Sequence, residues 1–282
     1  MNFSVVLPAK NEAATVGVVV KAIRARYPRS EVIVVNDGSD DDTQTLAEAA
    51  GAKVVNHPYS KGNGASIKSG ARAASGDVIV FMDADGQHNP DDIEALLAGI
   101  DEGYDLVVGA RQSGSQASVG RGVANGFYNK LASYMTGHKV EDLTSGFRAV
   151  RASKFKEFLY LLPNGFSYPT TSTMAFFRAG YSVKYVPIHA AQREGKSHIK
   201  PLKDGMRFLL IIFKIGTLYS PLKLFTPAAV IFFLMGLGWY GYTFVTVERF
   251  TNMSALLFTG AVVIFMMGLI SEQITALMYK KE

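Results

Sequence analysis

The sequence predicts an α/β domain with a mostly parallel sheet, followed by a hydrophobic helical hairpin. Two observations lead to this prediction. Residues 1 to about 190 alternate between short apolar runs and stretches of helical composition, the order expected of a parallel sheet covered by helices on both faces. Two long segments without a charged residue then follow, Leu224–Val247 and Phe250–Ser271.

Five short apolar runs bounded by turn residues predict the strands. They are Phe3–Leu7, Glu31–Val35, Lys53–Asn56, Val78–Met82 and Leu106–Val108. Helical composition between them predicts helices over Glu12–Arg26, Thr43–Ala50, Ala65–Ala74 and Pro90–Ile100. Two of these helices begin after helix-start signals, the aspartates of Asp40–Asp42 and the pair Asn89-Pro90.

Polar clusters follow four of the predicted strands, at the point where each strand ends. They are Pro8–Glu12, Asn36–Asp40, Asp83–Gln87 and Gly109–Arg111. Ligands of such sheets bind outside the carboxyl ends of the strands. We therefore expect these clusters to face a single crevice.

Composition and charge exclude several classes of protein. Only 19% of the 282 residues are charged, which argues against a wholly soluble enzyme because the deficit lies in the two uncharged segments. The chain has no cysteine, which excludes disulfides, thiolate zinc sites and cysteine nucleophiles. The net charge of +5 resides in residues 193–223, beside an apolar segment. That placement indicates contact with anionic membrane lipid, and we expect no nucleic-acid partner.

The two uncharged segments contain 24 and 22 residues, and about 20 residues are enough to cross a bilayer. We expect transmembrane helices at about 224–247 and 253–277, antiparallel because the linker is short. Lysines flank the outer ends of this pair, which places both ends in the cytoplasm by the positive-inside rule: Lys214, Lys223, Lys280 and Lys281. The first ten residues lack the features of a signal peptide, so the α/β domain is also expected on the cytoplasmic face.

These features set the expected domain boundaries. We expect residues 1–200 to form the α/β domain, residues 201–222 an amphipathic segment in the membrane interface, and residues 223–279 the two transmembrane helices. Two spans per chain leave apolar surface for association with other copies, so a homo-oligomer is an open alternative.

The segment Asp83-Ala84-Asp85-Gly86-Gln87-His88 follows an apolar strand, and both of its carboxylates can reach one hard cation there. Mg²⁺ or Mn²⁺ suits such a site, because Mg²⁺ is usually held by one or two carboxylates together with substrate phosphates. The alternative interpretation is an aspartate-rich turn that only caps the helix at Pro90.

Asn36-Asp37-Gly38-Ser39 closes the second strand in a similar way. Asp37 can accept hydrogen bonds from a base or a ribose, or the segment is an ordinary turn that caps the next helix. Lys61-Gly62-Asn63-Gly64 is rich in glycine like a phosphate-binding loop but lacks the spacing of a P-loop, so a plain turn is the simpler interpretation.

Five motifs in this order resemble the inverting GT-A glycosyltransferases of family 2, in particular the polyprenyl-phosphate branch typified by dolichyl-phosphate mannose synthase. Pro8–Glu12 is similar to the opening PAYNE motif, with Lys10 where tyrosine is usual. The family's DDGS, DADxQH, D-x-x-S-G-F-R and R-x-x-G-x-S segments are resembled by Asn36–Ser39, Asp83–His88, Asp142–Arg148 and Arg193–Ser197. The lysine that often follows the last motif is His198 here, with Lys200 two residues further on.

The resemblance implies a GT-A nucleotide-sugar-binding fold and a role for each matching residue. It implies donor binding by Pro8, Ala9, Glu12, Asp37, Asp83, Ala84, Asp85, Arg111, Arg193 and Lys200. It implies acceptor-phosphate contacts by Arg111, Arg121, Asn125 and Ser197, and metal ligation by Asp83, Asp85 and Gln87. The residues expected to act in catalysis are Asp85, Arg111 and Arg193.

The implied activity is inverting transfer of one hexose from a nucleotide sugar to the phosphate of a polyprenyl or dolichyl monophosphate. A phosphate monoester has a second pKa near ~6 and arrives ionised. We therefore expect no dedicated catalytic base, which transfer to a sugar hydroxyl would need. Mannose from GDP-mannose fits the motifs best, and glucose or another hexose from a UDP-sugar is the alternative.

Two other functions fit the sequence less well. A processive polysaccharide synthase carries a QxxRW motif, but the single tryptophan, Trp239, lies within the first apolar segment. A membrane-anchored scaffold that binds a nucleotide sugar without turnover is the non-enzymatic alternative. The carboxylate pair and the two arginine-containing motifs favour an enzyme.

Overall fold

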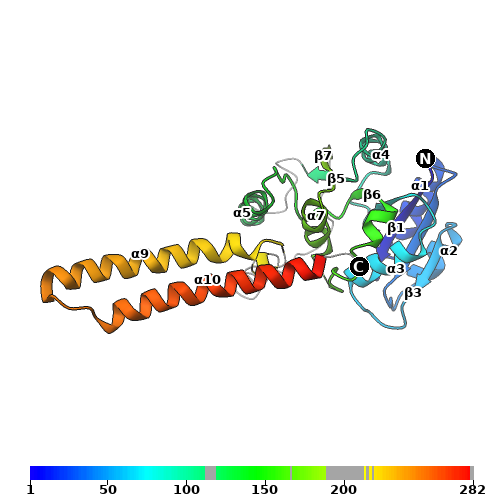
Figure 1. Ribbon diagram of the computed structural model, residues 1–282. Coiled ribbons are helices and arrows are strands. Elements are labelled where there is room, and N and C mark those ends of the chain that lie inside the picture. Colours follow the sequence, from blue (N-terminus) through cyan, green and yellow to red (C-terminus); the bar gives the residue numbers. More distant parts are fainter. Residues whose placement is uncertain (112–118, 166, 189–212, 214–215, 218, 280–282) are drawn as a thin grey trace. The chain divides into compact units, whose positions relative to one another are not determined.

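The computed structural model describes the chain except for residues 112–118, 166, 189–212, 214–215, 218 and 280–282, and it leaves the side chains of residues 119–125 undescribed. The chain divides into two compact units, Met1–His198 and Ile199–Glu282. The first unit is an α/β domain, and the second contains two long helices (Figure 1).

A seven-stranded sheet forms the centre of the first unit. Its strands are β1 (Phe3–Ala9), β2 (Glu31–Asn36), β3 (Lys53–Asn56), β4 (Val78–Phe81), β5 (Leu106–Arg111), β6 (Arg148–Arg151) and β7 (Val183–Ile188). Their order is β3-β2-β1-β4-β6-β5-β7. β6 runs antiparallel to both of its neighbours, and the other pairs are parallel. The prediction of a mostly parallel sheet is confirmed.

Two strands were not predicted from the sequence. β6 has only Ala149 and Val150 between arginines at its two ends, so it contains no apolar run. β7 mixes Lys184 and Pro187 with apolar residues at the edge of the sheet. Neither strand carries the continuous apolar pattern that marks a strand buried on both faces.

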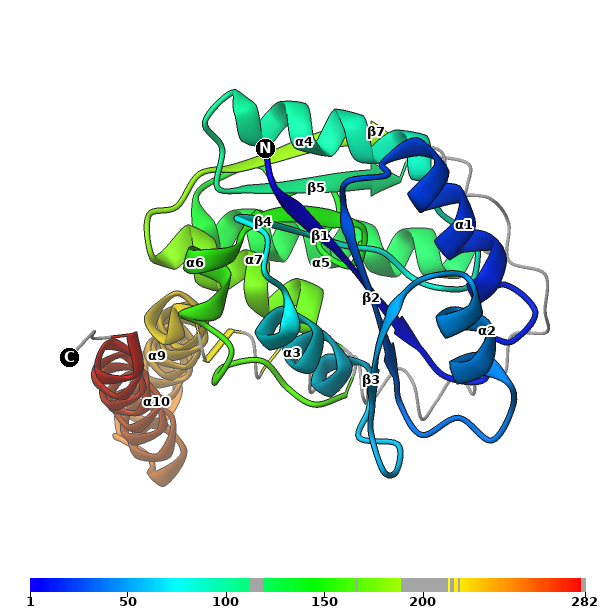
Figure 2. The ribbon, with the colours of Figure 1, turned by 90° about the vertical axis from the view of Figure 1, so that its right-hand side faces the viewer.

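Helices cover both faces of this sheet (Figure 2). They are α1 (Val16–Arg26), α2 (Thr43–Ala49), α3 (Asn63–Ala73), the 3₁₀ turn η1 (Pro90–Asp92), α4 (Ile93–Asp101), α5 (Val119–Thr136), α6 (Ala152–Lys156) and α7 (Tyr168–Arg178). The four helices predicted between the first five strands are present. α1 begins four residues later than predicted, because Asn11 has a left-handed φ of 57° and the carbonyl of Glu12 closes a turn with the amides of Thr15 and Val16.

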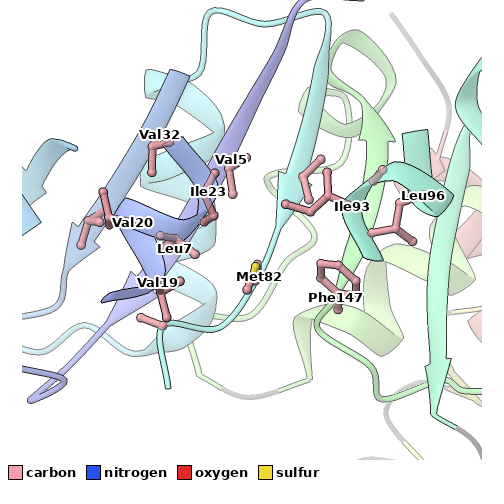
Figure 3. Packing of buried hydrophobic residues seen from close by; sticks show 14 of the residues in the cluster. Val5, Leu7, Val19, Val20, Ile23, Val32, Met82, Ile93, Leu96 and Phe147 are labelled. Carbon is pink, nitrogen blue, oxygen red and sulfur yellow. The ribbon is translucent and has the colours of Figure 1, made fainter. Parts of the chain in front are cut away.

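The core lies between the sheet and these helices. On one face, Val5, Leu7 and Val32 lie beside α1 and share one buried apolar cluster with side chains of α4, and burying each such side chain contributes about 1.5–3 kcal/mol (Figure 3). On the other face α3 approaches very closely, since a Cβ added to Gly70 would lie 2.3 Å from Cγ1 of Val6. This rigid sheet fixes the positions of the loops at its carboxyl edge.

The second unit contains the predicted helical hairpin, formed by α9 (Pro221–Val247) and α10 (Asn252–Tyr279). Both helices are long and apolar enough to cross a membrane, and most of their large apolar side chains are exposed. Ala229, Gly236 and Thr243 recur every seven residues on the buried side of α9, where small side chains let the helices approach. These features indicate membrane anchoring. Most of the predicted interfacial segment, residues 201–222, lies outside the described residues.

Candidate active site

A cleft of about 450 Å³ opens at the carboxyl ends of β1, β2 and β4. Its described lining combines residues from three of the predicted polar clusters with the loop before α3 and the first turn of that helix: Pro8, Ala9, Lys10, Glu12, Asp37, Ser60, Gly62, Asn63, Ser66, Asp83, Ala84 and Asp85. Three of the four polar clusters thus share one cleft. The fourth, Gly109–Arg111, is at the end of β5 and does not line it.

Asp83 and Asp85 lie at the β4 end of the cleft. The side chain of Asp83 is 38% exposed, and its Oδ2 lies 3.8 Å from Nε2 of His88. Oδ1 of Asp85 accepts a hydrogen bond of 3.1 Å from the backbone amide of Gln87, which is not one of the lining residues. Both carboxylates are therefore within reach of a ligand in the cleft.

This donor set fits a hard divalent cation that is shared with a substrate. Within the part of the chain that the structure describes, no group of three or more histidine, aspartate or glutamate side chains is arranged to hold a metal by itself. Mg²⁺ is typically bound through one or two carboxylates plus substrate phosphates, so the pair Asp83 and Asp85 fits a metal that binds with its nucleotide.

Asp37 at the β2 end has a very different environment. Its carboxylate accepts hydrogen bonds from His57 Nδ1 (2.7 Å), Ser60 Oγ (2.8 Å) and the backbone amides of Lys61 (2.8 Å) and Gly62 (2.9 Å). Burial alone would raise the pKa of Asp37, but these four donors outweigh it and lower the pKa to about 2. A carboxylate has about four lone-pair sites, so this one is saturated by the protein itself.

The same contacts explain the glycine-rich segment Lys61–Gly64. Two of its amides donate to Asp37, and the amide of Gly64 donates to the carbonyl of Gly165 at 3.1 Å. Gly62 has a φ of 99° and lies against the backbone at Asn164, so no larger residue would fit. The segment is a turn around Asp37 that leads directly into α3, whose first residues are Asn63 and Gly64.

Arg111 is held by Asp142, a pairing that sequence reasoning missed. Its Nε and Nη2 donate to the two carboxylate oxygens at 2.8 and 3.0 Å, and Nη2 also donates to Thr144 Oγ1 at 2.6 Å. Burial by itself raises the pKa of Asp142, but Arg111 outweighs that effect and the pKa is lowered. The hydrogen bonds that Arg111 donates to Asp142 are the main reason that the pKa of Arg111 is raised. Nη1 is the guanidinium nitrogen that the described contacts leave unused.

The segment Ser145–Arg148 lies behind Asp83 and His88. A Cβ on Gly146 would lie 3.4 Å from Oδ2 of Asp83, and the ring of Phe147 stacks on His88 with centroids 4.9 Å apart. Arg148 is fully buried, and its Nη1 donates to the carbonyl of Pro169 at 2.9 Å. Both ends of the D-x-x-S-G-F-R motif are thus structural supports, a role that residue types and spacing alone do not reveal.

The remaining predicted site residues lie outside this description. Arg121 and Asn125 belong to α5, but their side chains are not described. Arg193, Ser197 and Lys200 lie in a segment beyond the described residues. Their predicted roles therefore stay predictions.

Comparison with known proteins decides the family. Residues 4–159, more than half of the chain, match the model of glycosyl transferase family 2. The chain belongs to glycosyltransferase family 2. Residues 220–277 also match the GtrB C-terminal hairpin, which covers most of α9 and α10. The predicted family, and with it the class of enzyme, is confirmed.

Relatives in this family extend over most of the chain. A dolichyl-phosphate hexose transferase from Haloferax volcanii is 30% identical over 207 residues, which cover 72% of this chain and 89% of the relative. A polyprenol monophosphomannose synthase from Mycolicibacterium smegmatis is 29% identical over 207 residues, which cover 67% of this chain and 77% of the relative.

A solved structure confirms the predicted GT-A fold. Glucosyl-3-phosphoglycerate synthase from Mycobacterium tuberculosis, bound to Mn²⁺, UDP-glucose and phosphoglyceric acid, has a TM-score of 0.61 and 26% identity, and the match covers 76% of this chain and 78% of that one. Another structure of the same enzyme contains Mg²⁺ and UDP. The structural relatives of this glycosyltransferase therefore bind a divalent cation together with the nucleotide.

Proposed function

We propose that this glycosyltransferase moves one hexose, with inversion, from a nucleotide sugar to the phosphate of a polyprenyl or dolichyl monophosphate. The two relatives named for dolichyl-phosphate hexose transfer and polyprenol monophosphomannose synthesis support this acceptor. The second of them, together with the motif pattern, favours GDP-mannose as donor. The UDP-glucose bound to the structural relative makes a UDP-hexose the second candidate.

One observation carries the choice of acceptor. The two buried carboxylates in and beside the described cleft, Asp37 and Asp142, are both held ionised by partners that occupy their oxygens. Neither has a free oxygen to act as a base, and Asp83 and Asp85 fit a metal. Glu12, which also lines the cleft, accepts a hydrogen bond from Thr15 Oγ1 at 3.2 Å and is assigned to the donor by the resemblance. A hydroxyl acceptor would need a base, whereas a phosphate monoester with a second pKa near ~6 needs none.

In this reaction a phosphate oxygen bonds to the anomeric carbon as the bond to the leaving nucleoside diphosphate breaks. The protein holds two anions near each other and in line. Arg111, fixed through Nε and Nη2 by Asp142, offers Nη1 to the acceptor phosphate. By resemblance, Arg121, Asn125 and Ser197 would complete that contact, and Arg193 with Lys200 would close over the donor phosphates.

The donor would lie along the cleft from β2 to β4. Pro8, Ala9, Glu12 and Ala84 line its middle and would contact the nucleotide sugar. Asp37 would act by shaping the nucleoside end, because its own oxygens are occupied. Asp83 and Asp85, with the side chain of Gln87, would hold Mg²⁺ or Mn²⁺, which when bound supplies positive charge to the leaving diphosphate.

The hairpin suits an acceptor that is itself a membrane lipid. We propose that α9 and α10 anchor the catalytic domain on the cytoplasmic face, with the basic residues of segment 193–223 near anionic lipid. The phosphate of the lipid is then presented at the same surface as the enzyme.

A donor panel tests the proposal. The full chain, purified in detergent, is incubated with a polyprenyl phosphate, Mn²⁺ and either GDP-mannose, UDP-glucose or UDP-galactose. The mass of the lipid product is then determined by mass spectrometry. We expect a single hexosyl-phosphate lipid, formed fastest from GDP-mannose. If the protein binds the nucleotide in a metal-dependent way but forms no lipid product with any donor, the result would favour the non-catalytic scaffold.

A further inference from the structure

Lys10 is a positively charged residue in the lining of the cleft. It directly follows Ala9, the last residue of β1, and is one of the residues that line the cleft. Its side chain is exposed and forms no hydrogen bond or ion pair with any residue that the structure describes. A cation without a partner inside a ligand cleft is a candidate ligand contact.

The backbone that carries Lys10 is fixed before any ligand arrives. Asn11 adopts a left-handed φ of 57°, its amide donates to Ser39 Oγ at 3.0 Å, and its Oδ1 accepts from the amide of Asp40 at 3.0 Å. The amide of Glu12 donates to Thr43 Oγ1 at 2.9 Å. Lys10 therefore projects from a turn that is tied to the loop after β2.

The charges around Lys10 show what it could bind. Among the described residues that line the cleft, Lys10 is the one cation, against four carboxylates: Glu12, Asp37, Asp83 and Asp85. A nucleoside diphosphate brings further negative charge into this cleft. A divalent cation at Asp83 and Asp85 offsets that charge at the β4 end. At the β1 end, Lys10 is the described lining residue that carries positive charge.

The order of the strands places Lys10 along the nucleotide. β1 lies between β2, whose end carries Asp37, and β4, whose end leads to Asp83 and Asp85. A donor with its nucleoside toward Asp37 and its diphosphate toward the carboxylate pair passes the end of β1. An ammonium group at that point would lie near the phosphates that link the nucleoside to the sugar.

We propose that Lys10 binds the diphosphate of the donor and gives this enzyme nucleotide affinity that does not depend on the metal. The inference rests on the proposed nucleotide-sugar chemistry but adds a residue to it. Where the resembled motif has tyrosine, a phenol would offer one neutral hydrogen bond. An ammonium group offers a full charge and three donors. The contact should therefore weaken as salt rises.

Equilibrium binding of nucleotides to the full-length protein tests this. Affinities for GDP, guanosine, UDP and uridine are measured by calorimetry in detergent, with Mn²⁺ and with EDTA, for the wild type and three variants. Lys10→Met removes the charge at similar length, Lys10→Arg keeps it, and Lys21→Met removes an exposed charge on α1 as a matched control.

We expect Lys10→Met to weaken the preferred diphosphate about ten-fold, equivalent to about 1.4 kcal/mol, in both Mn²⁺ and EDTA, and to leave the nucleoside unchanged. Lys10→Arg should restore most of the affinity, and Lys21→Met should match the wild type. The difference between wild type and Lys10→Met should shrink as salt is raised from 50 to 500 mM, because screening shortens the reach of the charge.

Two outcomes overturn the inference while leaving the proposed function intact. Equal loss of nucleoside and diphosphate would assign Lys10 to the base or ribose. Unchanged diphosphate binding in Lys10→Met, with a wild type that binds normally, would show that Lys10 makes no contact. A wild type that binds no nucleoside diphosphate would refute the proposed function and the inference together.

Discussion

Asp37 and Asp83 follow two strands of the same sheet and line the same cleft, but the protein surrounds them differently. Asp37 is 4% exposed and accepts four hydrogen bonds from a single loop and its flanking histidine. The side chain of Asp83 is 38% exposed and has His88 at 3.8 Å. At the β2 end the protein's own hydrogen bonds occupy the carboxylate, whereas at the β4 end the carboxylate is left open to a ligand. The same residue type in similar strand-end motifs can therefore serve either the fold or the chemistry.

The largest expected effect is at the β4 end. Asp85→Asn removes an anionic ligand from the proposed metal and should lower kcat by a hundred-fold or more, on the order of 2.7 kcal/mol in the barrier. The thermal midpoint should not change, because the site serves a ligand and not the fold. Transfer rate and melting temperature are measured side by side, with Asp101→Asn as control, because Asp101 is exposed at the C-terminal end of α4. Near-full activity in excess EDTA would contradict the metal assignment.

Arg111 provides a second test on the catalytic side. Arg111→Ala should reduce kcat/KM for the lipid acceptor at least ten-fold, on the order of 1.4 kcal/mol, because the acceptor phosphate loses its guanidinium. Asp142→Asn should reduce kcat/KM by a smaller factor, because it weakens the hydrogen bonds that hold Arg111 but keeps the guanidinium itself. Initial rates against acceptor concentration separate the two variants. An equal loss of donor affinity in Arg111→Ala would place this arginine on the donor instead.

At the β2 end, a substitution should lower the stability of the fold. Asp37→Asn places an NH₂ group where one carboxylate oxygen accepts from a backbone N–H, which should cost about 1–3 kcal/mol of folding free energy. The thermal midpoint of the full chain in detergent is compared with that of Asp83→Asn, which should be unchanged. If the thermal midpoint of Asp83→Asn falls as far as that of Asp37→Asn, the proposed difference between the two ends of the cleft is wrong.

The sequence predicts features that depend on neighbouring residues, but it does not predict contacts between residues far apart along the chain. Strands β1 to β5 and the four helices between them follow from local apolar runs and turn residues. The four partners of Asp37 come from residues 57–62, and Asp142 lies 31 residues from Arg111. Such pairings arise only when the sheet brings loops together, so the sequence identifies the motif residues but not which of them bind each other.

Lowering the pH should remove part of the stability that ionised Asp37 contributes at the β2 end. The pKa of Asp37 is lowered from 3.8 to about 2, so the folded state holds this proton less readily than the unfolded chain. Its contribution, about 2 kcal/mol, is complete above about pH 4 and is lost as the pH falls toward 2. The difference in melting temperature between wild type and Asp37→Asn should therefore narrow below pH 4. A constant difference down to pH 2 would show that the hydrogen bonds do not depend on the ionised carboxylate.

The central claim is that the acceptor phosphate supplies its own ionised nucleophile and the protein supplies no base. The most direct test compares the pH dependence of kcat/KM for a polyprenyl phosphate with that for the matching phosphonate, whose second pKa is higher. With the phosphate, we predict a rate that rises through a single step near pH ~6 and is level above pH 7. The step should move upward with the pKa of the phosphonate. A step that stays at the same pH for both acceptors would belong to a protein group and would contradict the account.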